Sequence, residues 1–430
     1  MIINISNNSR GQRYPTGCKK QSLDEFSTML IKKARDLGLP MGAPCFIDYT
    51  CPYEGRGTLK RNLFDKYLQR YPKLKIMVCF IPKVDEIYHE LKTVAELKTA
   101  GGLVTQCISQ ENERKCTQET FIGNVLLKIN AKLQGVNVIL DSSCCPELLK
   151  KLTMIVGLDV THPAPADRLS QSIAACVGTY DRHFTKYHAR VVVQPKPKKE
   201  IVDLASMMSD LLNRFRGVNN RLPAYIVIYR DGVSEGQFDE VMVKELGKLK
   251  ESFKTFKDKD GSEYSPKISF MVVQKRNHTR FMAVDSRQAA RSGNVHPGTV
   301  VDRTITSNVL FDFYVIAHQG MIGTSRPVHY YMLYDEIKVS ADDVQKMTYF
   351  LSYLYPRCTR SISVPPPVMY AHLSAKRARS HIFILDESDA QSAVSSGSGG
   401  QYRQLSPAET EAMNNQLMVR PNLNGVLYYI

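Results

Sequence analysis

Several common features are missing from this sequence of 430 residues, and each absence narrows the class of protein. No stretch approaches the roughly 18 to 20 uninterrupted apolar residues of a membrane-spanning helix, and no signal peptide opens the chain. The ten cysteines include no Cys-x-x-Cys pair and no zinc-type spacing, which argues against structural zinc and against a disulfide framework. The absence of tryptophan decides nothing. We expect a soluble protein of the cytoplasm, or of the nucleus, with reduced thiols and no membrane partner.

Acidic residues are also in short supply. The chain has 57 Lys and Arg against 42 Asp and Glu, a formal charge of +15, and the basic residues are spread along its length. Such a distribution favours a polyanionic partner, and nucleic acid is the first candidate. With 43% hydrophobic residues the chain is apolar enough to fold, and its length predicts two domains.

The first part of the chain alternates helical patterns with short apolar runs. Residues 1–19 have little periodicity and are expected to be a linker. The spacing then predicts helices over 22–37, 58–70, 85–98 and 117–133, separated by strands over 44–48, 74–81 and 103–108. Strands separated by helices of this length imply a parallel sheet covered on both faces. The sequence therefore predicts a small α/β, Rossmann-like domain over 20–150.

The pattern changes after residue 152. Three strand-like runs, 154–160, 172–180 and 187–194, follow one another with short connections, which favours antiparallel pairing. A helix over 200–216, an apolar strand over 224–229 and a helix over 236–256 come next. This order of elements is the layout of an RNase H-like fold, which we expect over 151–430. Near 386–403 a Ser/Gly-rich stretch predicts a surface loop.

Two acidic residues stand in unusual positions in this second domain. Asp159 interrupts the apolar strand 154–160, where a charge is costly unless it has a task. The apolar run Tyr225–Tyr229 ends before Arg230, and Asp231 comes next in the sequence. Either one alone is more often a strand-end aspartate that caps a loop. As a pair in this order of elements, they favour a nuclease in which carboxylates hold two divalent cations beside a phosphate.

Five blocks of sequence resemble, nearly residue for residue, the PIWI domains of eukaryotic Argonautes: Gly157–Pro163, Tyr229–Phe238, Val273–Arg280, Gly323–Pro327 and Tyr370–Leu373. The resemblance is specific because all five blocks occur in the family's order along one chain. The resemblance covers about residues 20–430, which correspond to a MID domain followed by a PIWI domain. Nothing here corresponds to the N-terminal or PAZ domains of that family, so we expect a fragment or a truncated form.

In members of the family that cleave RNA, the resemblance implies an active site of Asp, Glu, Asp and His that binds Mg²⁺ or Mn²⁺. The matching positions here are Asp159, Glu200, Asp231 and His372. Glu200 is expected at a helix start, where a glutamate also has the simpler use of complementing the helix dipole. His372 would be an ordinary core or surface histidine without its place in the Tyr-Ala-His-Leu block.

A second site is implied for the phosphorylated 5′ end of a guide RNA. Tyr88 and Lys92, and likewise Lys128 and Lys132, stand four residues apart on expected helices. Two lysines at this spacing usually form a solvated face. The resemblance instead implies that the lysines and Gln106 hold the phosphate while Tyr88 stacks on the first base. It also implies that Arg377 reaches the same pocket from the second domain.

Other basic residues are expected to contact the guide backbone rather than its bases: Lys275, Arg276, Arg326 and Arg357. Met369 stands where close relatives would have an aromatic residue, which puts one backbone contact in doubt.

The leading hypothesis is a guide-directed endoribonuclease that acts as a monomer on complementary target RNA. The alternative is a guide-binding silencing module that represses through partner proteins without cutting. A guide-free, RNase H-like or transposase-like nuclease is a third reading, disfavoured by the phosphate pocket.

Overall fold

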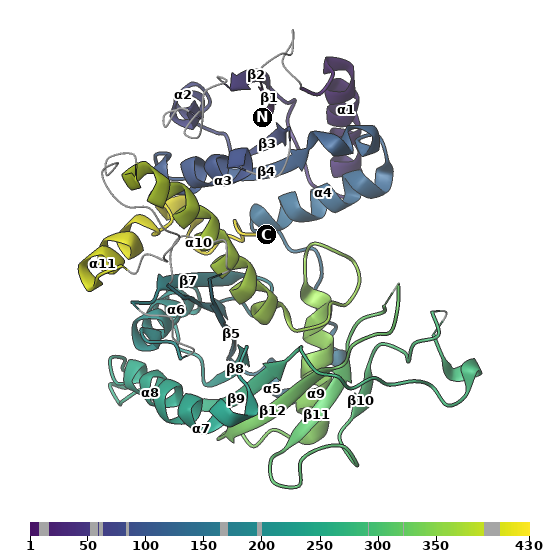
Figure 1. The fold of residues 1–430 in the computed structure, drawn as a ribbon, viewed down its shortest axis with the longest axis vertical. Helices are drawn as coiled ribbons and strands as arrows, with labels where there is room; N and C mark the ends of the chain where they lie inside the picture. The colour runs from purple at the N-terminus through teal and green to yellow at the C-terminus, as the bar shows by residue number, and fades with distance from the viewer. Residues whose placement is uncertain are drawn as a thin grey trace, which may run out of the picture.

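The computed structural model describes residues 1–7, 17–51, 59, 63–82, 86–163, 171–195, 200–290, 292–320, 322–390 and 405–430. Within these residues the strands form two sheets, each covered by helices, one above the other in Figure 1. No helix in the described part of the chain is both long and apolar enough to cross a membrane. The predicted α/β fold class, with two sheet-containing units, is confirmed.

The first sheet is parallel throughout, with strand order β2-β1-β3-β4. Its strands are β1 (Ile2–Asn7), β2 (Phe46–Cys51), β3 (Ile76–Ile81) and β4 (Val104–Ser109). The prediction of a linker over 1–19 is wrong for residues 2–7, because β1 pairs with both β2 and β3 inside the sheet. Its pairing partners lie some 40 to 75 residues further along the chain, so the local pattern gives no sign of them.

Helices cover both faces of this sheet, as the alternation of elements predicts. They are α1 (Lys20–Asp36), α2 (Leu63–Arg70), α3 (Glu86–Thr93) and α4 (Glu119–Lys132). Phe26 of α1 and Val125 of α4 pack on one face against Phe80, while Phe64 of α2 and Leu91 of α3 pack on the other. Helix α3 continues as one π-helical turn, Val94–Lys98, which carries Glu96.

The second sheet has the order β10-β11-β12-β9-β8-β5-β6-β7. Its strands are β5 (Thr153–Thr161), β6 (Ile173–Thr179), β7 (Tyr187–Val193), β8 (Tyr225–Asp231), β9 (Lys267–Gln274), β10 (Thr299–Val301), β11 (Asp312–Ile316) and β12 (Val328–Asp335). Strands β5, β6 and β7 pair antiparallel as expected, and β8 lies parallel to both β5 and β9. The predicted RNase H-like order is therefore present.

Helices on opposite faces complete this second unit. On one face lie α6 (Leu204–Asn219), α7 (Phe238–Val241) and α8 (Gly247–Phe253), with a π-helical turn, Met242–Leu246, between the last two. The other face carries α5 (Glu147–Lys150), α9 (Ala341–Leu351) and α10 (Pro366–Ala390), and α11 (Pro407–Gln416) packs on β7. Short 3-10 turns lie at Gln110–Lys115, Ser142–Cys144, Glu235–Gln237, Ser286–Gln288, Ser352–Leu354 and Pro421–Leu423.

Helix α10 joins the two units. It packs on β5 and β6 of the second sheet and extends to α3 beside the first, as Figure 1 shows. Apolar residues of both units, Leu97 and Ala131 from the first and Leu423 and Ile430 from the C-terminal segment, share one hydrophobic cluster with α10. The Ser/Gly-rich loop was expected near 386–403, but residues 386–390 belong to α10. The remaining residues, 391–403, lie outside the described part of the chain.

Candidate functional site

Two buried carboxylates mark the edge of the second sheet. Asp159 lies near the end of β5 and Asp231 ends the parallel neighbour β8, where Leu158 is in register with Arg230. Only 6% of Asp159 and 7% of Asp231 is exposed. The parallel pairing of the predicted first and fourth strands therefore brings the two acids to one place.

The surroundings of Asp231 are unfavourable to its charge. Burial raises the pKa of Asp231, and the neighbouring charge of Asp159 adds to the rise, while Lys275 opposes it. The Lys275 ammonium forms an ion pair with the Asp231 carboxylate. Lys275, predicted to contact the guide backbone, lies beside the acidic pair.

The end of β8 is held by a fully buried ion pair. Arg230, 1% exposed, bonds to both oxygens of Glu245, which is 0% exposed, and to the backbone oxygen of Asp231. Gly232 then turns the chain with φ of +80°, a conformation that favours glycine. These contacts fix the direction in which Asp231 leaves the strand.

His372 reaches the acidic pair from α10. Its Nδ1 lies 3.2 Å from Oδ2 of Asp159, and about half of its side chain is exposed. The close approach of α10 to β5 depends on Gly157, where an added Cβ would come within 2.1 Å of the Pro367 backbone oxygen. Gly157 was not predicted as a site residue, yet it permits the contact between α10 and β5.

We expect Gly157→Ala to lower the free energy of unfolding by about 2 kcal/mol or more, because the obstructing atoms are backbone and cannot swing aside. Gly123→Ala in α4 is the matched control: apart from its chain neighbours and the backbone of its own helix, nothing lies within 4 Å of its added Cβ, and a helical Gly→Ala change stabilises by about 0.5–1 kcal/mol. Urea unfolding of the two variants measures both effects. A Gly157→Ala protein as stable as the wild type would refute the need for this close approach.

Glu200, the fourth predicted metal ligand, is not brought to the acidic pair. Its carboxylate lies 3.4 Å from the ammonium of Lys244, which also bonds to Glu240. The expected helix begins at Leu204 rather than at residue 200, so Glu200 lies in the preceding segment. Within the described residues, no group of three or more His, Cys, Asp or Glu side chains is close enough together to hold a metal ion.

A second cluster of charged groups lies at the junction of the two units. Lys92 of α3 donates to both oxygens of Thr105, the backbone oxygen at 3.0 Å and the hydroxyl at 2.6 Å. Lys132 of α4 donates to the same backbone oxygen at 3.0 Å and to Oε1 of Gln106 at 3.0 Å. Two helices and the strand β4 thus bring both lysines and Gln106 together.

Arg377 of α10 enters this cluster from the second unit. It donates to the Tyr88 hydroxyl at 2.9 Å and to the backbone oxygen of Tyr428 at 3.3 Å, and it forms an ion pair with Glu96. Glu96 also accepts a hydrogen bond from His381 and lies 3.8 Å from Lys92. The structure thus places Arg377 at the interface of the units, beside the C-terminal segment.

Among the described residues, buried positive charge exceeds buried negative charge in this cluster. Lys92, Lys132 and Arg377 are 1%, 2% and 4% exposed, and the described carboxylate that they face is that of Glu96. Burial opposes ionisation of Glu96, yet Arg377, His381 and Lys92 hold its pKa below the ordinary value. The pKa of Lys132 is held well below its ordinary value by burial and by the charges of Lys92 and Arg377. Such a cluster would be stabilised by an added anion.

The remaining predicted basic residues fall into two groups. Lys128 is half-buried, and burial together with Arg357 lowers its pKa, which places Arg357 near Lys128. Arg276 and Arg326 are exposed at the end of β9 and before β12, two strands that pair antiparallel. A hydrogen bond of 2.9 Å from Asn277 to the Pro327 oxygen ties these segments together. Both arginines therefore lie at the end of the sheet that carries Asp231.

Several members of the two clusters were missed by reading the sequence. Glu96 and Thr105 carry no motif of their own, although Glu96 follows Lys92 at the i,i+4 spacing of a helical ion pair. His381 had an adjacent signal, because it follows Arg377 by four residues. Their roles depend on contacts between segments that are distant in sequence.

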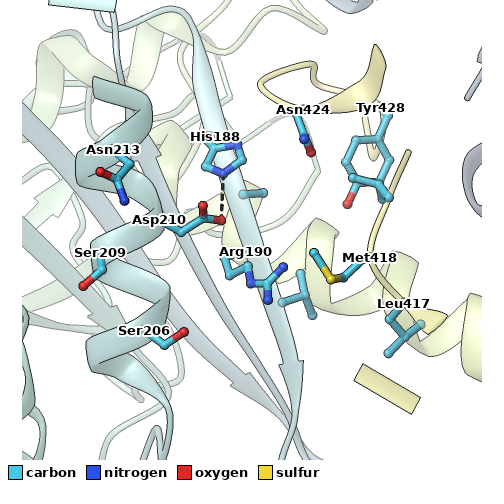
Figure 2. Close-up of a pocket in the computed structure, with 13 residues that line it drawn as sticks. His188, Arg190, Ser206, Ser209, Asp210, Asn213, Leu417, Met418, Asn424 and Tyr428 are labelled. Atoms are coloured by element: carbon cyan, nitrogen blue, oxygen red, sulfur yellow. Dashed lines mark hydrogen bonds and ion pairs between the residues drawn. The ribbon is translucent and has the colours of Figure 1, made fainter. Parts of the chain in front are cut away.

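A separate cavity of about 380 Å³ lies between β7, α6 and the C-terminal segment, as Figure 2 shows. The His188 ring bonds to Asp210 there at 3.2 Å, which lowers the pKa of that carboxyl. Tyr428 lines this cavity while its backbone oxygen accepts from Arg377, so the cavity borders the cation cluster. None of the predicted site residues lines it.

Comparisons with known proteins agree with the observed fold. The family model described as the Piwi domain matches residues 76–383. The C-terminal lobe of a budding yeast Argonaute is 28% identical, with a TM-score of 0.84 over all of this chain and 85% of that chain. Kluyveromyces polysporus Argonaute with a guide RNA is 29% identical, with a TM-score of 0.85 over all of this chain and 51% of that chain. The MID-PIWI domains of N. crassa QDE-2 share the fold at 23% identity, with a TM-score of 0.64 over all of this chain and 98% of that chain.

Proposed function

The chain belongs to the Piwi domain family, and from that premise we propose that it binds the phosphorylated 5′ end of a small guide RNA and cleaves RNA paired to that guide. The solved Argonaute that it resembles at 29% identity contains a guide RNA. Since the chain spans about half the length of that protein, the activity belongs to the whole protein of which such a lobe is part.

The observation that carries the binding proposal is the buried excess of positive charge around Lys92, Lys132 and Arg377. A terminal phosphate supplies the missing negative charge and several acceptor oxygens at one point. Gln106 borders the same cations, Lys128 lies one helical turn before Lys132 on α4, and Tyr88 offers an aromatic face for the first base. Because Arg377 comes from the second unit, a bound 5′ end would contact both units.

The observation that supports cleavage is the acidic pair of Asp159 and Asp231. Two buried carboxylates, of which Asp159 disfavours the charge of Asp231, lie beside an imidazole and are a donor set suited to a hard divalent cation. Asp159 and Asp231 would hold Mg²⁺ or Mn²⁺, with His372 and Glu200 as further ligands. The ion would supply neutralisation of phosphate charge and a more acidic water.

This chain's own residues set the remaining conditions for hydrolysis. Lys275 would leave Asp231 and Glu200 would leave Lys244 before the four predicted ligands meet, since both are now engaged in ion pairs. His372, half exposed beside Asp159, is placed to hold or transfer a proton. Arg276 and Arg326 at the same end of the sheet would position the backbone of the guide and target duplex.

The same two ion pairs favour a second candidate, a guide-binding silencing module that does not cut. If Glu200 stays with Lys244 and Lys275 stays with Asp231, the metal site is never completed. Guide binding at the cation cluster would be unaffected, and repression would then depend on partner proteins.

The experiment that tests the binding proposal is analysis of the nucleic acid that copurifies with this chain. We expect small RNAs of narrow length distribution that carry a 5′-phosphate, because the buried cations select that terminal group. Sequencing libraries that require a 5′-phosphate are compared with libraries prepared after phosphatase and kinase treatment. RNA of random length with mixed 5′ ends would show general electrostatic binding and contradict the proposal.

A further inference from the structure

Strand β7 is the last strand at one end of the second sheet, so one of its edges faces away from β6. In an antiparallel pair, the backbone groups of successive residues point alternately toward the partner strand and away from it. Gln194, just beyond β7, donates to the Ser172 backbone oxygen at 2.9 Å and therefore faces the β6 side. The preceding residue, Val193, must then direct its N–H and C=O outward. By the same alternation, the backbone groups of Val191 and Ala189 also point outward.

Asn414 of α11 already pairs with this outer edge as a neighbouring strand would. Its Oδ1 accepts a hydrogen bond from the Val193 N–H at 2.7 Å, and its Nδ2 donates to the Val193 oxygen at 3.1 Å. One side-chain amide thus makes both hydrogen bonds that a paired peptide strand would make. This contact closes the edge at Val193 and shows that the edge accepts an amide group.

The next two outward positions are open. Among the described residues, the outward backbone groups of Val191 and Ala189 have no hydrogen-bond partner. Both residues are partly exposed and line the cavity of about 380 Å³, whose other walls are α6 and the C-terminal segment (Figure 2). The row of peptide groups that Asn414 occupies at Val193 therefore continues into a cavity without a partner.

We propose that this cavity binds an extended segment of a partner protein, which adds a short strand to the outer edge of β7 at Ala189 and Val191. An unpaired strand edge is a template for such pairing, and the main-chain hydrogen bonds supply the affinity. Each of the two residues offers one N–H and one C=O. The proposal does not depend on guide binding or cleavage, because neither proposed RNA site includes these residues.

Arg190 gives the cavity a preference for an acidic side chain. It lines the cavity, and in the described part of the chain it forms no hydrogen bond or ion pair. The acidic residue of the same lining, Asp210, is engaged by the His188 ring at 3.2 Å. A carboxylate from a ligand can form two parallel hydrogen bonds with a guanidinium group. We therefore expect an aspartate or glutamate of the bound segment to pair with Arg190.

The two faces of β7 predict an alternating sequence for the bound segment. Arg190 projects on the same face as Val192, which packs in the cluster beneath α6. Ala189 and Val191 pack on the opposite face, in the cluster that contains Leu417. Successive side chains of an added strand also point to opposite faces. An acidic residue beside Arg190 should therefore be flanked by apolar residues on the side of Leu417.

The test is selection of short random peptides displayed on phage against the immobilised protein, followed by fluorescence polarisation with synthetic copies of the enriched peptides. We expect enriched sequences in which apolar and acidic residues alternate. Ser209→Trp places an indole on the α6 wall of the cavity and should weaken binding at least about 10-fold. Arg190→Glu should weaken it to a similar extent. Arg182→Glu, at an exposed position before β7, controls for the change in charge and should bind normally.

Methylation of single amides in an enriched peptide tests strand pairing on the wild-type protein, so the result does not depend on the folding of a variant. The N–H groups of an added strand point alternately to β7 and to solvent. Methylation should therefore weaken binding about 10-fold or more at every second position of the paired stretch and change it little in between. Equal losses at successive positions would overturn pairing with β7.

Other outcomes also contradict the proposal. It is overturned if the library yields no peptide that binds more tightly than about 1 mM, or only peptides whose binding survives Ser209→Trp. Sedimentation velocity tests whether a second copy of this chain is the occupant instead. A concentration-dependent dimer that Ser209→Trp abolishes would assign the edge to self-association and overturn the binding of a partner segment. Loss of guide binding in a separate RNA assay would contradict only the proposed function.

Discussion

Replacing Asp231 by Asn should reduce cleavage of a matched target RNA at least about 1,000-fold in a full protein that contains this lobe, a loss of about 4 kcal/mol of transition-state stabilisation. The carboxylate lies with Asp159 on adjoining parallel strands, and an amide at this position cannot supply the negative charge that a divalent cation requires. Asp159→Asn should have the same effect. Guide binding should be unchanged, since the cation cluster lies on other elements.

The assay uses a guide with a 5′-phosphate, a labelled complementary target and Mg²⁺ or Mn²⁺. Because the guide is anchored at its 5′ end and the paired duplex has a fixed geometry, one product of constant length is expected whatever the sequence. Asp239→Asn, an exposed aspartate on α7 a few residues beyond β8, is the matched control and should cleave normally. No discrete product from the wild type, or an unchanged product from Asp231→Asn, would leave the non-cutting module as the function.

Thermal unfolding shows whether the Asp231 variant is folded and whether the site takes a metal. A carboxyl whose pKa is raised binds its proton more tightly in the folded protein, so its contribution to stability is present at low pH and lost as pH rises through the folded pKa. Without metal at pH 7, Asp231→Asn should therefore melt no lower than the wild type. Mn²⁺ should raise the melting temperature of the wild type and leave that of the variant unchanged.

Lys132→Ala should weaken binding of a 5′-phosphorylated RNA about 10- to 100-fold, because a hydrogen bond between charged groups contributes about 1.5–3 kcal/mol. Lys132 is 2% exposed and its ammonium shares the Thr105 oxygen with Lys92, so its charge is directed into the cluster. Binding of the 5′-hydroxyl RNA should change less than about 3-fold. Lys128→Ala should act in the same direction with a smaller effect, since Lys128 is only half-buried.

Filter binding with the two RNAs measures the discrimination directly. Lys73→Ala removes an exposed lysine of the same unit and controls for general loss of positive charge. Equal weakening of both RNAs by Lys132→Ala would mean that this lysine contributes only to general electrostatics. The phosphate pocket would then have to lie elsewhere.

Regular elements were predictable because their signals are local. The alternation of helical and apolar runs predicted most helices and strands up to residue 256 to within a few residues, for example 117–133 for α4 and 154–160 for β5. The strands and helices beyond residue 256 were not predicted. The start of α6 was predicted four residues too early, because Glu200 to Asp203 resemble a first helical turn. Strand β1 was missed, because only its partners β2 and β3 make its short apolar run into a central strand.

The sequence by itself determined the family, the α/β fold, and the charged residues of the proposed metal and phosphate sites. Short contiguous motifs carry these residues, so Asp159, Asp231, Lys92, Lys132 and Arg377 could be named without coordinates. Only the tertiary structure decided which partners these charges have. Glu96 meets Arg377 across 281 residues, Lys275 engages Asp231, and Lys244 holds Glu200. The pKa of a buried group and its ion-pair partner depend on the side chains that surround it in the folded protein. Those side chains can come from any part of the sequence, so local motifs do not reveal them.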